Sequence, residues 1–426
     1  MSTGINLAYG KENIPLNLNK PYKVLTPPSR PLPGNPSKLT GEALNNPLGT
    51  LPLSKMPRAG DKIAVVVSDQ TRVTGSRTFL PLLIEELNKA GVPHDDVTII
   101  FATGNHSPPV QQEKINIAGE QLLSKVKSLS HEAGKREDMA FLGRTSRGTP
   151  VELNRHYVEA DFRIITGSIL HHYFAGFGGG RKSLLPGIAS RETILANHQL
   201  VFDPTISQGV HPKVAPGSLE GNPVHEDMLE AAAMAPPDFM FNTIVDMKGN
   251  IIDAVSGDYQ QAHLEGCRKA RELYAVSIDE RADLVIASCG GYPKDINMIQ
   301  IQKSLYNVSL AVKEGGAIIL LAQCPGGIGS GEFLHWFSYP SPHRAEEVLR
   351  DSFELNGFTA LSIMRINQKS RVINYTRLDS DLVEKMGMTP AESLEEALDR
   401  ALINKDPLIY VIPFGSTTVP EIKQMK

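Results

Sequence analysis

The sequence predicts an α/β protein with two Rossmann-like domains and an active site in the cleft between them. The chain of 426 residues is longer than one hydrophobic core usually supports. Short β-branched apolar runs alternate with helical patterns, which is typical of parallel sheets. Polar residues follow directly after several of these runs, at the edge where parallel sheets bind ligands. We expect an N-terminal domain over residues 1–275 and a C-terminal domain over residues 276–426.

The N-terminal domain is predicted to begin with a β-hairpin, because apolar residues alternate on both sides of Gly10-Lys11. Residues 63–67 (IAVVV) are short, apolar and β-branched, as expected of a strand that is buried on both faces. The other elements predicted here are a helix that ends at Gly91, strands at 97–102 and 162–166, a hairpin over 242–255 and a helix over 259–274.

The C-terminal domain is predicted from a second α/β series that begins near Asp279. Its strands are expected at 284–288, 317–322, 371–376 and 408–413, and its helices at 297–313 and 393–402. This repeated order of strand and helix favours a second parallel sheet.

Composition excludes several classes of protein. The net charge of −4 implies no basic face, so we expect no nucleic-acid partner. No run of about eighteen apolar residues occurs, so no membrane span is expected. Cys267, Cys289 and Cys324 form no CxxC pair, which is typical of buried thiols in a reduced, cytoplasmic protein. The sequence leaves the oligomeric state open.

The stretch HHYFAGFGGGRKSLLPG (171–187) combines histidines, a glycine run and an Arg-Lys-Ser triplet. It is not a P-loop, because Arg181 separates Gly180 from Lys182, and it does not have the G-x-G-x-x-G spacing of dinucleotide sites. Consecutive glycines could still expose backbone N–H groups to an anion, with Arg181 as a phosphate clamp. From spacing alone, a plain glycine turn is slightly favoured.

Three histidines are each expected to lie in a loop flanked by small or turn residues: His106 in TGNHSP, His172 in ILHHYF and His198 in LANHQL. They are far apart in the sequence, so no local metal-binding spacing applies and only the fold could bring them together. On residue type alone, a three-histidine zinc site is one interpretation.

Two further places combine polar residues. Asp69 and Arg72 follow the first buried strand, where they could pair with each other, or orient a histidine and bind a carboxylate. In the second domain, Gln300 and Lys303 are three residues apart on one helix face and could both reach a ligand, although a solvated lysine is the more common outcome. Asp295 is expected to cap that helix.

These segments together resemble the nickel-dependent lactate racemase family over nearly the whole chain. The resemblance rests on SDQTR (68–72), ATGNH (102–106), the long stretch from His172 to Gly187, ANH (196–198) and GGYPKD with the following Gln300 and Lys303. The long central stretch is the most specific of these.

The resemblance implies a cofactor, the nickel-pincer nucleotide: a pyridinium-3-thioamide-5-thiocarboxylic acid mononucleotide that holds nickel. Its thioamide would form on Lys182, and its nickel would be bound by His198. His106 and His172 would be the two acid/base residues. The expected cofactor contacts are Asp69, Arg72, Gly178, Gly179, Gly180, Arg181 and Ser183. The expected substrate contacts are Arg72, Tyr292, Ile299, Gln300 and Lys303. Cofactor-maturation enzymes would be partners.

The chemistry accounts for this set of residues. Removal of hydride from C2 of a 2-hydroxy acid gives a planar keto acid, and return of hydride to the other face inverts the centre. Each face needs its own base for the hydroxyl proton, and histidine titrates near neutral pH. A primary amine such as that of Lys182 can form a thioamide, whereas an arginine could not.

Two positions depart from the family's lactate-specific members. Ile299 stands where they carry a tyrosine, and Phe358 corresponds to a tryptophan. Both changes would alter the surroundings of the substrate's side chain, so we expect a family member that acts on a 2-hydroxy acid other than lactate, or on several. A zinc hydrolase that uses the same histidines and a non-catalytic nucleotide- or phosphate-binding protein are the alternatives.

Overall fold

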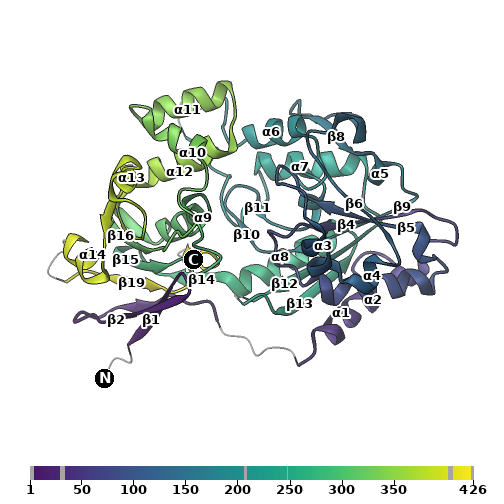
Figure 1. Cartoon of the computed structure of the whole chain (residues 1–426), viewed down its shortest axis with the longest axis horizontal. Helices are drawn as coiled ribbons and strands as arrows, with labels where there is room; N and C mark the ends of the chain where they lie inside the picture. Colours follow the sequence, from purple (N-terminus) through teal and green to yellow (C-terminus); the bar gives the residue numbers. More distant parts are fainter. Residues whose placement is uncertain (1–3, 29–33, 206–208, 247, 402–405, 424–426) are drawn as a thin grey trace. The chain divides into compact units, whose positions relative to one another are not determined.

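The computed structural model describes residues 4–28, 34–205, 209–246, 248–401 and 406–423. The chain divides into two compact units (Figure 1). Unit 1 comprises residues 1–29, 204–209 and 273–426, and unit 2 comprises residues 30–203 and 210–272. Each unit is built around a six-stranded sheet flanked by helices, which confirms the predicted α/β class.

Unit 2 has the sheet order β13-β12-β9-β4-β5-β6, in which only β13 is antiparallel to its neighbour. Its strands are β4 (Ile63–Ser68), β5 (Val97–Ala102), β6 (Lys127–Ser130), β9 (Phe162–Ser168), β12 (Phe239–Val245) and β13 (Ile251–Gly257). A separate hairpin joins β7 (Met139–Arg144) to β8 (Pro150–Asn154), and a two-residue pairing joins β10 (His171–His172) to β11 (Gly176–Phe177).

Helices cover both faces of this sheet. One face packs against α1 (Pro36–Asn45), α2 (Ser76–Lys89), α3 (Gln111–Ala118) and α4 (Glu120–Leu123), with Val65, Phe79 and Phe241 in the shared core. The turn η4 (Gly180–Ser183) contacts β4 and β9, and α7 (Pro223–Met234) contacts η4. The remaining helices of this unit are α5 (Arg155–Val158), α6 (Arg191–Gln199) and α8 (Gln261–Tyr274), which ends at the unit boundary.

Unit 1 has the all-parallel sheet order β18-β17-β16-β15-β19-β3. Its strands are β3 (Lys23–Val24), β15 (Ala282–Ser288), β16 (Val312–Leu321), β17 (Arg371–Tyr375), β18 (Thr389–Ala391) and β19 (Ile409–Ile412). The helices α9 (Met298–Ser309) and α12 (Leu355–Lys369) pack on one another and on β16, while α14 (Leu394–Ala401) packs on β16 and β17. Also in this unit are α10 (Gly331–His335), α11 (Pro342–Asp351), α13 (Ser380–Lys385) and the pair β14 (Ala275–Ile278) with β20 (Val419–Ile422).

The N-terminal hairpin, β1 (Ile5–Tyr9) and β2 (Glu12–Leu16), forms as predicted around Gly10-Lys11. It belongs to unit 1, however, and not with the residues that follow it in sequence. Leu7, Tyr9 and Leu16 are buried in the core of unit 1, and the Tyr9 ring stacks on Tyr375 with centroids 4.5 Å apart. The hairpin's apolar side therefore finds its partner more than 260 residues away in sequence.

Candidate active site

Three neighbouring parallel strands of unit 2 end in the loops that carry the expected site residues. Asp69 directly follows β4, His106 follows β5 by a four-residue turn, and His172 lies just beyond β9. Because β5, β4 and β9 are adjacent and parallel, their carboxyl ends meet at one edge of the sheet. Gly104 N–H donates to the carbonyl of Gly187 (2.9 Å), which joins the His106 loop to the end of the central glycine stretch.

Asp69 and His106 form a hydrogen-bonded pair. The Oδ2 of Asp69 lies 2.7 Å from Nδ1 of His106, and its Oδ1 accepts from the hydroxyl of Thr71 (2.6 Å). Burial opposes ionisation of Asp69, but the hydrogen bonds from His106 and Thr71 outweigh it and hold the pKa of the carboxyl below its usual value. A carboxylate that accepts from Nδ1–H leaves the lone pair of a neutral imidazole on Nε2, so His106 is oriented as a base.

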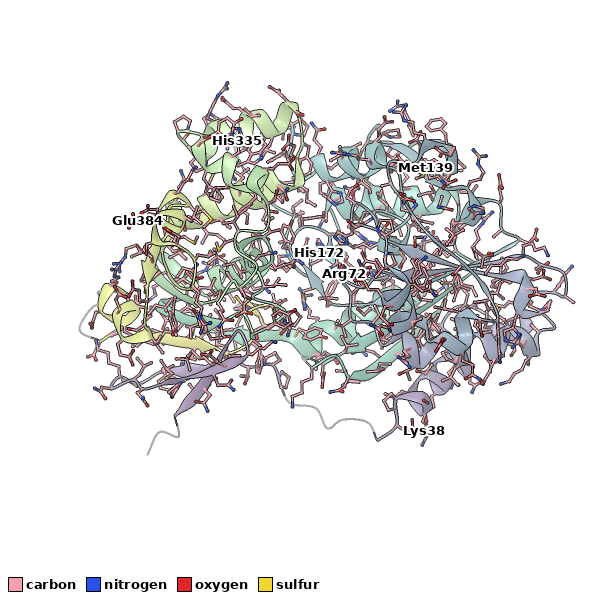
Figure 2. All side chains as sticks on the ribbon, in the orientation of Figure 1. Lys38, Arg72, Met139, His172, His335 and Glu384 are labelled. Atoms are coloured by element: carbon pink, nitrogen blue, oxygen red, sulfur yellow. The ribbon has the colours of Figure 1, made fainter. Side chains whose placement is uncertain are left out.

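Arg72 lies in the same turn, where its N–H donates to the carbonyl of Asp69 (3.2 Å) and its side chain is exposed. Figure 2 labels both Arg72 and His172 on unit 2. Asp69 thus accepts from His106 and Thr71, and the side chain of Arg72 is left exposed.

His172 and Lys182 approach each other across the central stretch. The Nζ of Lys182 lies 3.2 Å from Nε2 of His172 and 5.2 Å from the ring centroid of Phe174. Nδ1 of His172 accepts from the N–H of Ala175 (3.3 Å), which fixes the ring against its own loop. Both side chains are half-buried. The preceding His171 packs its ring on Phe177, with centroids 4.7 Å apart, as a packing neighbour would.

His198 lies in the last turn of α6 and not in a loop, so that expectation is wrong. It completes this group, which we call the central cluster: His172, Phe174, Lys182 and His198. Its ring meets Phe174 edge-on with centroids 4.9 Å apart, so Phe174 contacts both the amine and the imidazole. Burial, and then the charge of Lys182, lower the pKa of His198 to about 3. His198 is therefore neutral at physiological pH, the form in which imidazole binds metals. The cluster and the Asp69–His106 pair all belong to unit 2.

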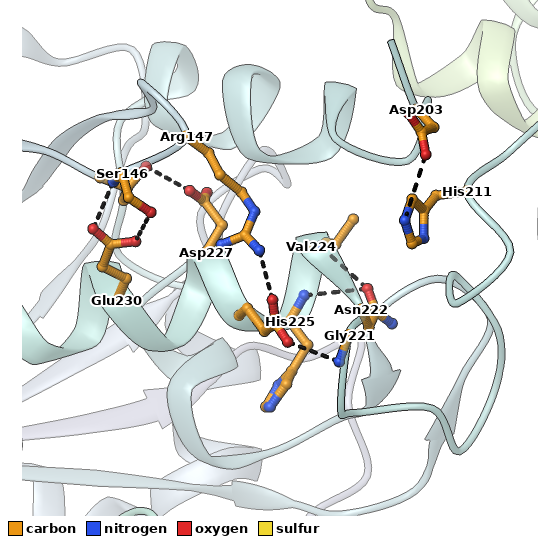
Figure 3. Close-up of polar contacts among 12 residues, drawn as sticks. Ser146, Arg147, Asp203, His211, Gly221, Asn222, Val224, His225, Asp227 and Glu230 are labelled. Atoms are coloured by element: carbon orange, nitrogen blue, oxygen red, sulfur yellow. Dashed lines mark hydrogen bonds and ion pairs between the residues drawn. The ribbon is translucent and has the colours of Figure 1, made fainter. Parts of the chain in front are cut away.

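Polar contacts behind His198 tie α6 to α7. Asn197 Nδ2 donates to the carboxylate of Asp227 (2.9 Å) and to the carbonyl of Val224 (3.1 Å). Asp227 is fully buried and also accepts from the hydroxyl of Thr145 (2.5 Å). Figure 3 shows Asp227 among the polar side chains around the first turns of α7. This link could not be predicted from the sequence, because nothing in the spacing of Asn197 and Asp227 indicates that they meet.

The glycine run is not arranged as an anion seat. Gly178 N–H donates to the carbonyl of Leu170 (2.8 Å), and Gly180 N–H donates to Oδ1 of Asn242 (2.7 Å). The hydroxyl of Ser183 donates to the carbonyl of Thr166 (2.8 Å).

Arg181 is 1% exposed and bonds to backbone carbonyls of its own loop, so its guanidinium does not face a ligand. These existing hydrogen bonds do not support the expectation that Gly178, Gly180, Arg181 and Ser183 hold a phosphate.

The expected residues of unit 1 lie in and just before the first turns of α9. Lys303 Nζ donates to Oε1 of Gln300 (3.1 Å), which confirms that the two share a helix face. Tyr292 is half-exposed, with Lys11 Nζ 5.5 Å from its ring centroid. A Cβ added to Gly329 would lie 3.0 Å from Ile299 Cδ1, so the glycine leaves room for that side chain.

One expectation in unit 1 is wrong, that of the helix cap. Asp295 does not cap the helix, since Asn297 does so by accepting from the N–H of Gln300 (3.0 Å). Asp295 is instead fully buried and accepts from the N–H of Gly10 (2.6 Å) at the tip of the N-terminal hairpin. Phe358 is 5% exposed and packs on Phe353, so it belongs to the core of the unit.

Comparisons with known proteins decide the family. Residues 9–209 match the model of the lactate racemase N-terminal domain, and residues 278–419 match that of the lactate racemase C-terminal domain. The chain belongs to the lactate racemase family. This family membership makes it an isomerase of the racemase type.

Individual relatives agree with the assignment. A lactate racemase of Thermoanaerobacterium thermosaccharolyticum is 37% identical over 389 residues, and one of Lactiplantibacillus plantarum is 34% identical over 385 residues. Each alignment covers 88% of both chains.

Solved structures show the same fold. The apoprotein of the Thermoanaerobacterium thermosaccharolyticum lactate racemase superposes on this racemase with a TM-score of 0.89 at 35% identity, covering 98% of this chain and 100% of that one. A protein from Thermotoga maritima shares the fold at 18% identity, with a TM-score of 0.65, covering 91% of this chain and 98% of that one. Among the described residues, no helix of this racemase is long and apolar enough to cross a membrane.

Proposed function

We propose that this racemase inverts C2 of a 2-hydroxy acid by hydride transfer, and that it carries the nickel-pincer nucleotide covalently on Lys182. The observation that carries the proposal is the central cluster. In it, the amine that would form the thioamide lies 3.2 Å from the imidazole of His172, and a second imidazole, that of His198, contacts the same Phe174 ring.

The side chains of this cluster fit such a group. Lys182 supplies the primary amine that a thioamide link requires. His198 is neutral, the state in which an imidazole nitrogen can bind nickel. Imidazole is a suitable ligand for nickel beside softer sulfur donors.

When bound, the cofactor supplies an acceptor for the hydride that leaves C2. The protein's own residues handle the proton. Asp69 holds Nδ1–H of His106, so Nε2 of His106 takes the hydroxyl proton as C2 becomes planar. His172 gives a proton to the oxygen when hydride returns from the opposite face, and the configuration at C2 is thereby inverted. For the other enantiomer the two histidines exchange roles.

Particular charged and polar groups are assigned to binding of the substrate. Arg72 is suited to hold the substrate's carboxylate because guanidinium binds carboxylates through two hydrogen bonds. Gln300 and Lys303, already in contact with each other, provide further donors. Tyr292 and Ile299 would face the substrate's side chain. Both relatives named above are lactate racemases. Because Ile299 replaces a tyrosine of lactate-specific members, we propose a 2-hydroxy acid other than lactate, or several.

The two alternatives have less support. A zinc hydrolase would need three protein ligands around one metal, and the described residues contain no group of three His, Cys, Asp or Glu side chains suited to that. A phosphate-binding module would need open N–H groups in the glycine run, where those of Gly178 and Gly180 are already bonded. Stoichiometric zinc after expression without the maturation enzymes, together with hydrolase activity, would favour the first alternative.

An isotope experiment tests the hydride step. The protein is expressed together with the cofactor-maturation enzymes and incubated in ordinary water with enantiopure 2-hydroxy acids that carry deuterium at C2, lactate included. Circular dichroism follows racemisation, and mass spectrometry follows the label. Hydride transfer predicts inverted product that retains deuterium. Inverted product that has lost the label to solvent would show that C2 is deprotonated instead.

A further inference from the structure

We propose that Arg181 is a positioning residue that holds the loop of Lys182 in place from its buried side. Its Nη1 donates to the carbonyl of Phe177 (2.9 Å) and, more weakly, to that of Gly179 (3.4 Å). Its Nη2 donates to the carbonyl of Ala175 (2.7 Å). One planar guanidinium thus binds three carbonyls from alternate residues of the segment that leads to Lys182. This inference rests on the proposed function only in giving Lys182 its role.

The charge of Arg181 has no carboxylate beside it among the described residues. No ion pair within the described part of the chain involves this guanidinium, and burial lowers its pKa only to about 10, so it stays charged. Its ionisable neighbours are His263, His225 and Cys267. Burial, and then the charge of Arg181, lower the pKa of both histidines, and burial raises the pKa of the Cys267 thiol to about 12.

All three neighbours are therefore neutral near pH 7, and the three carbonyl dipoles, together with the imidazole of His263 whose Nε2 lies 2.9 Å from Nη1, are the main compensation for the buried charge. A charge that depends on these carbonyls strongly favours the one loop conformation that turns them inward. The conformation of the loop and the burial of Arg181 are thus coupled.

The glycines of the run allow this close packing. A Cβ at Gly180 would lie 2.6 Å from Cδ2 of His263, and one at Gly179 would lie 2.4 Å from Oδ1 of Asn242. Gly180 and Gly179 also have positive φ angles, 52° and 68°, which residues other than glycine rarely adopt. The glycine run therefore lets His263 and Asn242 close against the loop, and this explains the run without a bound anion.

The contacts of Arg181 determine the position of the neighbouring Lys182. Arg181 and Lys182 are adjacent in η4, yet they contact different groups: Arg181 contacts His263 and the loop carbonyls, and Lys182 contacts His172 and Phe174. Anchoring of the loop by Arg181 fixes the backbone from which the Lys182 amine projects. A lysine at position 181 could not replace it, because an ammonium lacks the planar set of donors that spans several carbonyls.

The test uses protein without cofactor, so that its outcome is independent of the proposed reaction. Variants R181Q, R181K and R181A are compared with wild type by hydrogen–deuterium exchange of residues 172–183, with strand β4 as internal reference. The rate at which an amine-reactive reagent modifies Lys182 is measured by peptide mass spectrometry. R163Q is the matched control, because Arg163 also donates to a backbone carbonyl (Val158, 2.8 Å) but lies at the start of β9.

We expect R181Q to raise the rate of amide hydrogen exchange in residues 172–183 by about tenfold or more, while the rate in β4 is unchanged. In wild type, local opening of the loop must break the charged hydrogen bonds of Arg181, and in R181Q this cost is lost. The modification rate of Lys182 should change with it. R181K, which keeps the charge but not the planar donors, should lie between wild type and R181Q. Added guanidinium at a non-denaturing concentration should restore wild-type exchange and labelling in R181A, a rescue that general destabilisation would not give.

A folded R181Q or R181K whose loop exchange and Lys182 labelling match R163Q would overturn the proposal. If R181Q does not fold, R181K and the rescue of R181A decide by the same criteria. Failure of the proposed function is seen separately, as the lack of a Lys182 adduct in wild type expressed with the maturation enzymes. If wild type carries the adduct but substitution of Arg181 leaves exchange of residues 172–183 and labelling of Lys182 unchanged, only this inference is refuted.

Discussion

Oδ2 of Asp69 lies 2.7 Å from Nδ1 of His106, and Asp69 itself is 2% exposed. A buried carboxylate at the end of one strand thus fixes the ring of a histidine that is partly exposed at the end of the next. The arrangement orients the imidazole through Nδ1, as required of a general base that acts through Nε2.

Replacement of Asp69 by Asn should reduce turnover far more than it reduces substrate binding. The amide no longer stabilises a protonated His106, and it can favour the wrong tautomer. We expect kcat to fall about 100-fold or more, the range typical of an impaired general base. T71V is the matched control, since it removes one hydroxyl contact to Asp69 and keeps the carboxylate. Equal losses in D69N and T71V, by circular dichroism with enantiopure substrate, would count against this role of Asp69.

The two histidines should serve opposite enantiomers. H106Q should still oxidise one enantiomer to the keto acid in a single turnover, and H172Q should oxidise only the other, because each variant retains the base for one face. Cofactor-loaded protein is mixed with each enantiomer, quenched in acid and assayed for keto acid. Loss of the same enantiomer in both variants would mean that the two histidines do not act on opposite faces.

The link behind His198 should support both stability and metal retention. N197A leaves the buried carboxylate of Asp227 without one of its donors, and removal of a hydrogen bond to a buried charged group costs about 2 kcal/mol. Urea unfolding measures that loss, and a chelator should strip nickel faster from N197A than from wild type. R191A, at the exposed first turn of the same helix, is the control. An N197A protein as stable as R191A, with unchanged nickel loss, would contradict the role given to this link.

Acid should destabilise unit 2 before its carboxylates titrate. Burial lowers the pKa of His131 to about 4, while its Nε2 contacts the carbonyl of Ala189 (2.9 Å). Between pH 6.5 and about 4 the unfolded chain therefore binds a proton that the folded chain does not, so the free energy of unfolding falls as pH falls through this window. Above pH 6.5 the contribution is complete, and over the window it amounts to about 3 kcal/mol.

The variant H131Q should show a shallower decline in Tm over the same pH range, and H156Q, at an exposed position, should match wild type. Parallel declines in all three proteins would show that His131 does not contribute to the acid sensitivity.

Strong apolar periodicity made much of the fold predictable. The strand expected at 97–102 matches β5, and the buried run at 63–67 lies within β4. The hairpin of β7 and β8 was missed because β7 (MAFLGR) has neither continuous apolar character nor alternation. The domain to which the N-terminal hairpin belongs could not be read from its own residues, since its apolar face fits any core and only tertiary packing selects one.

Site residues that follow the ends of strands could be predicted from the sequence. The partners of buried polar residues could not. Asp69 and His106 follow adjacent parallel strands, so their meeting could be expected from the sequence. Arg181 beside a glycine run looks like an anion clamp in sequence, and only the three-dimensional structure turns its guanidinium inward onto carbonyls. The prediction that Asp295 caps a helix was wrong for the same reason. Its hydrogen-bond partner, the N–H of Gly10, lies 285 residues away in the sequence.

The central claim is that Lys182 carries the cofactor, and intact mass spectrometry tests it most directly. Wild type and K182R are each expressed with and without the maturation enzymes, and nickel is measured in the same samples. The account predicts a mass increase of one nickel-free or nickel-bearing mononucleotide in wild type, only with the maturation enzymes, mapped to the peptide of Lys182 and missing in K182R. No adduct and no nickel in wild type, or an adduct that persists in K182R, would contradict it.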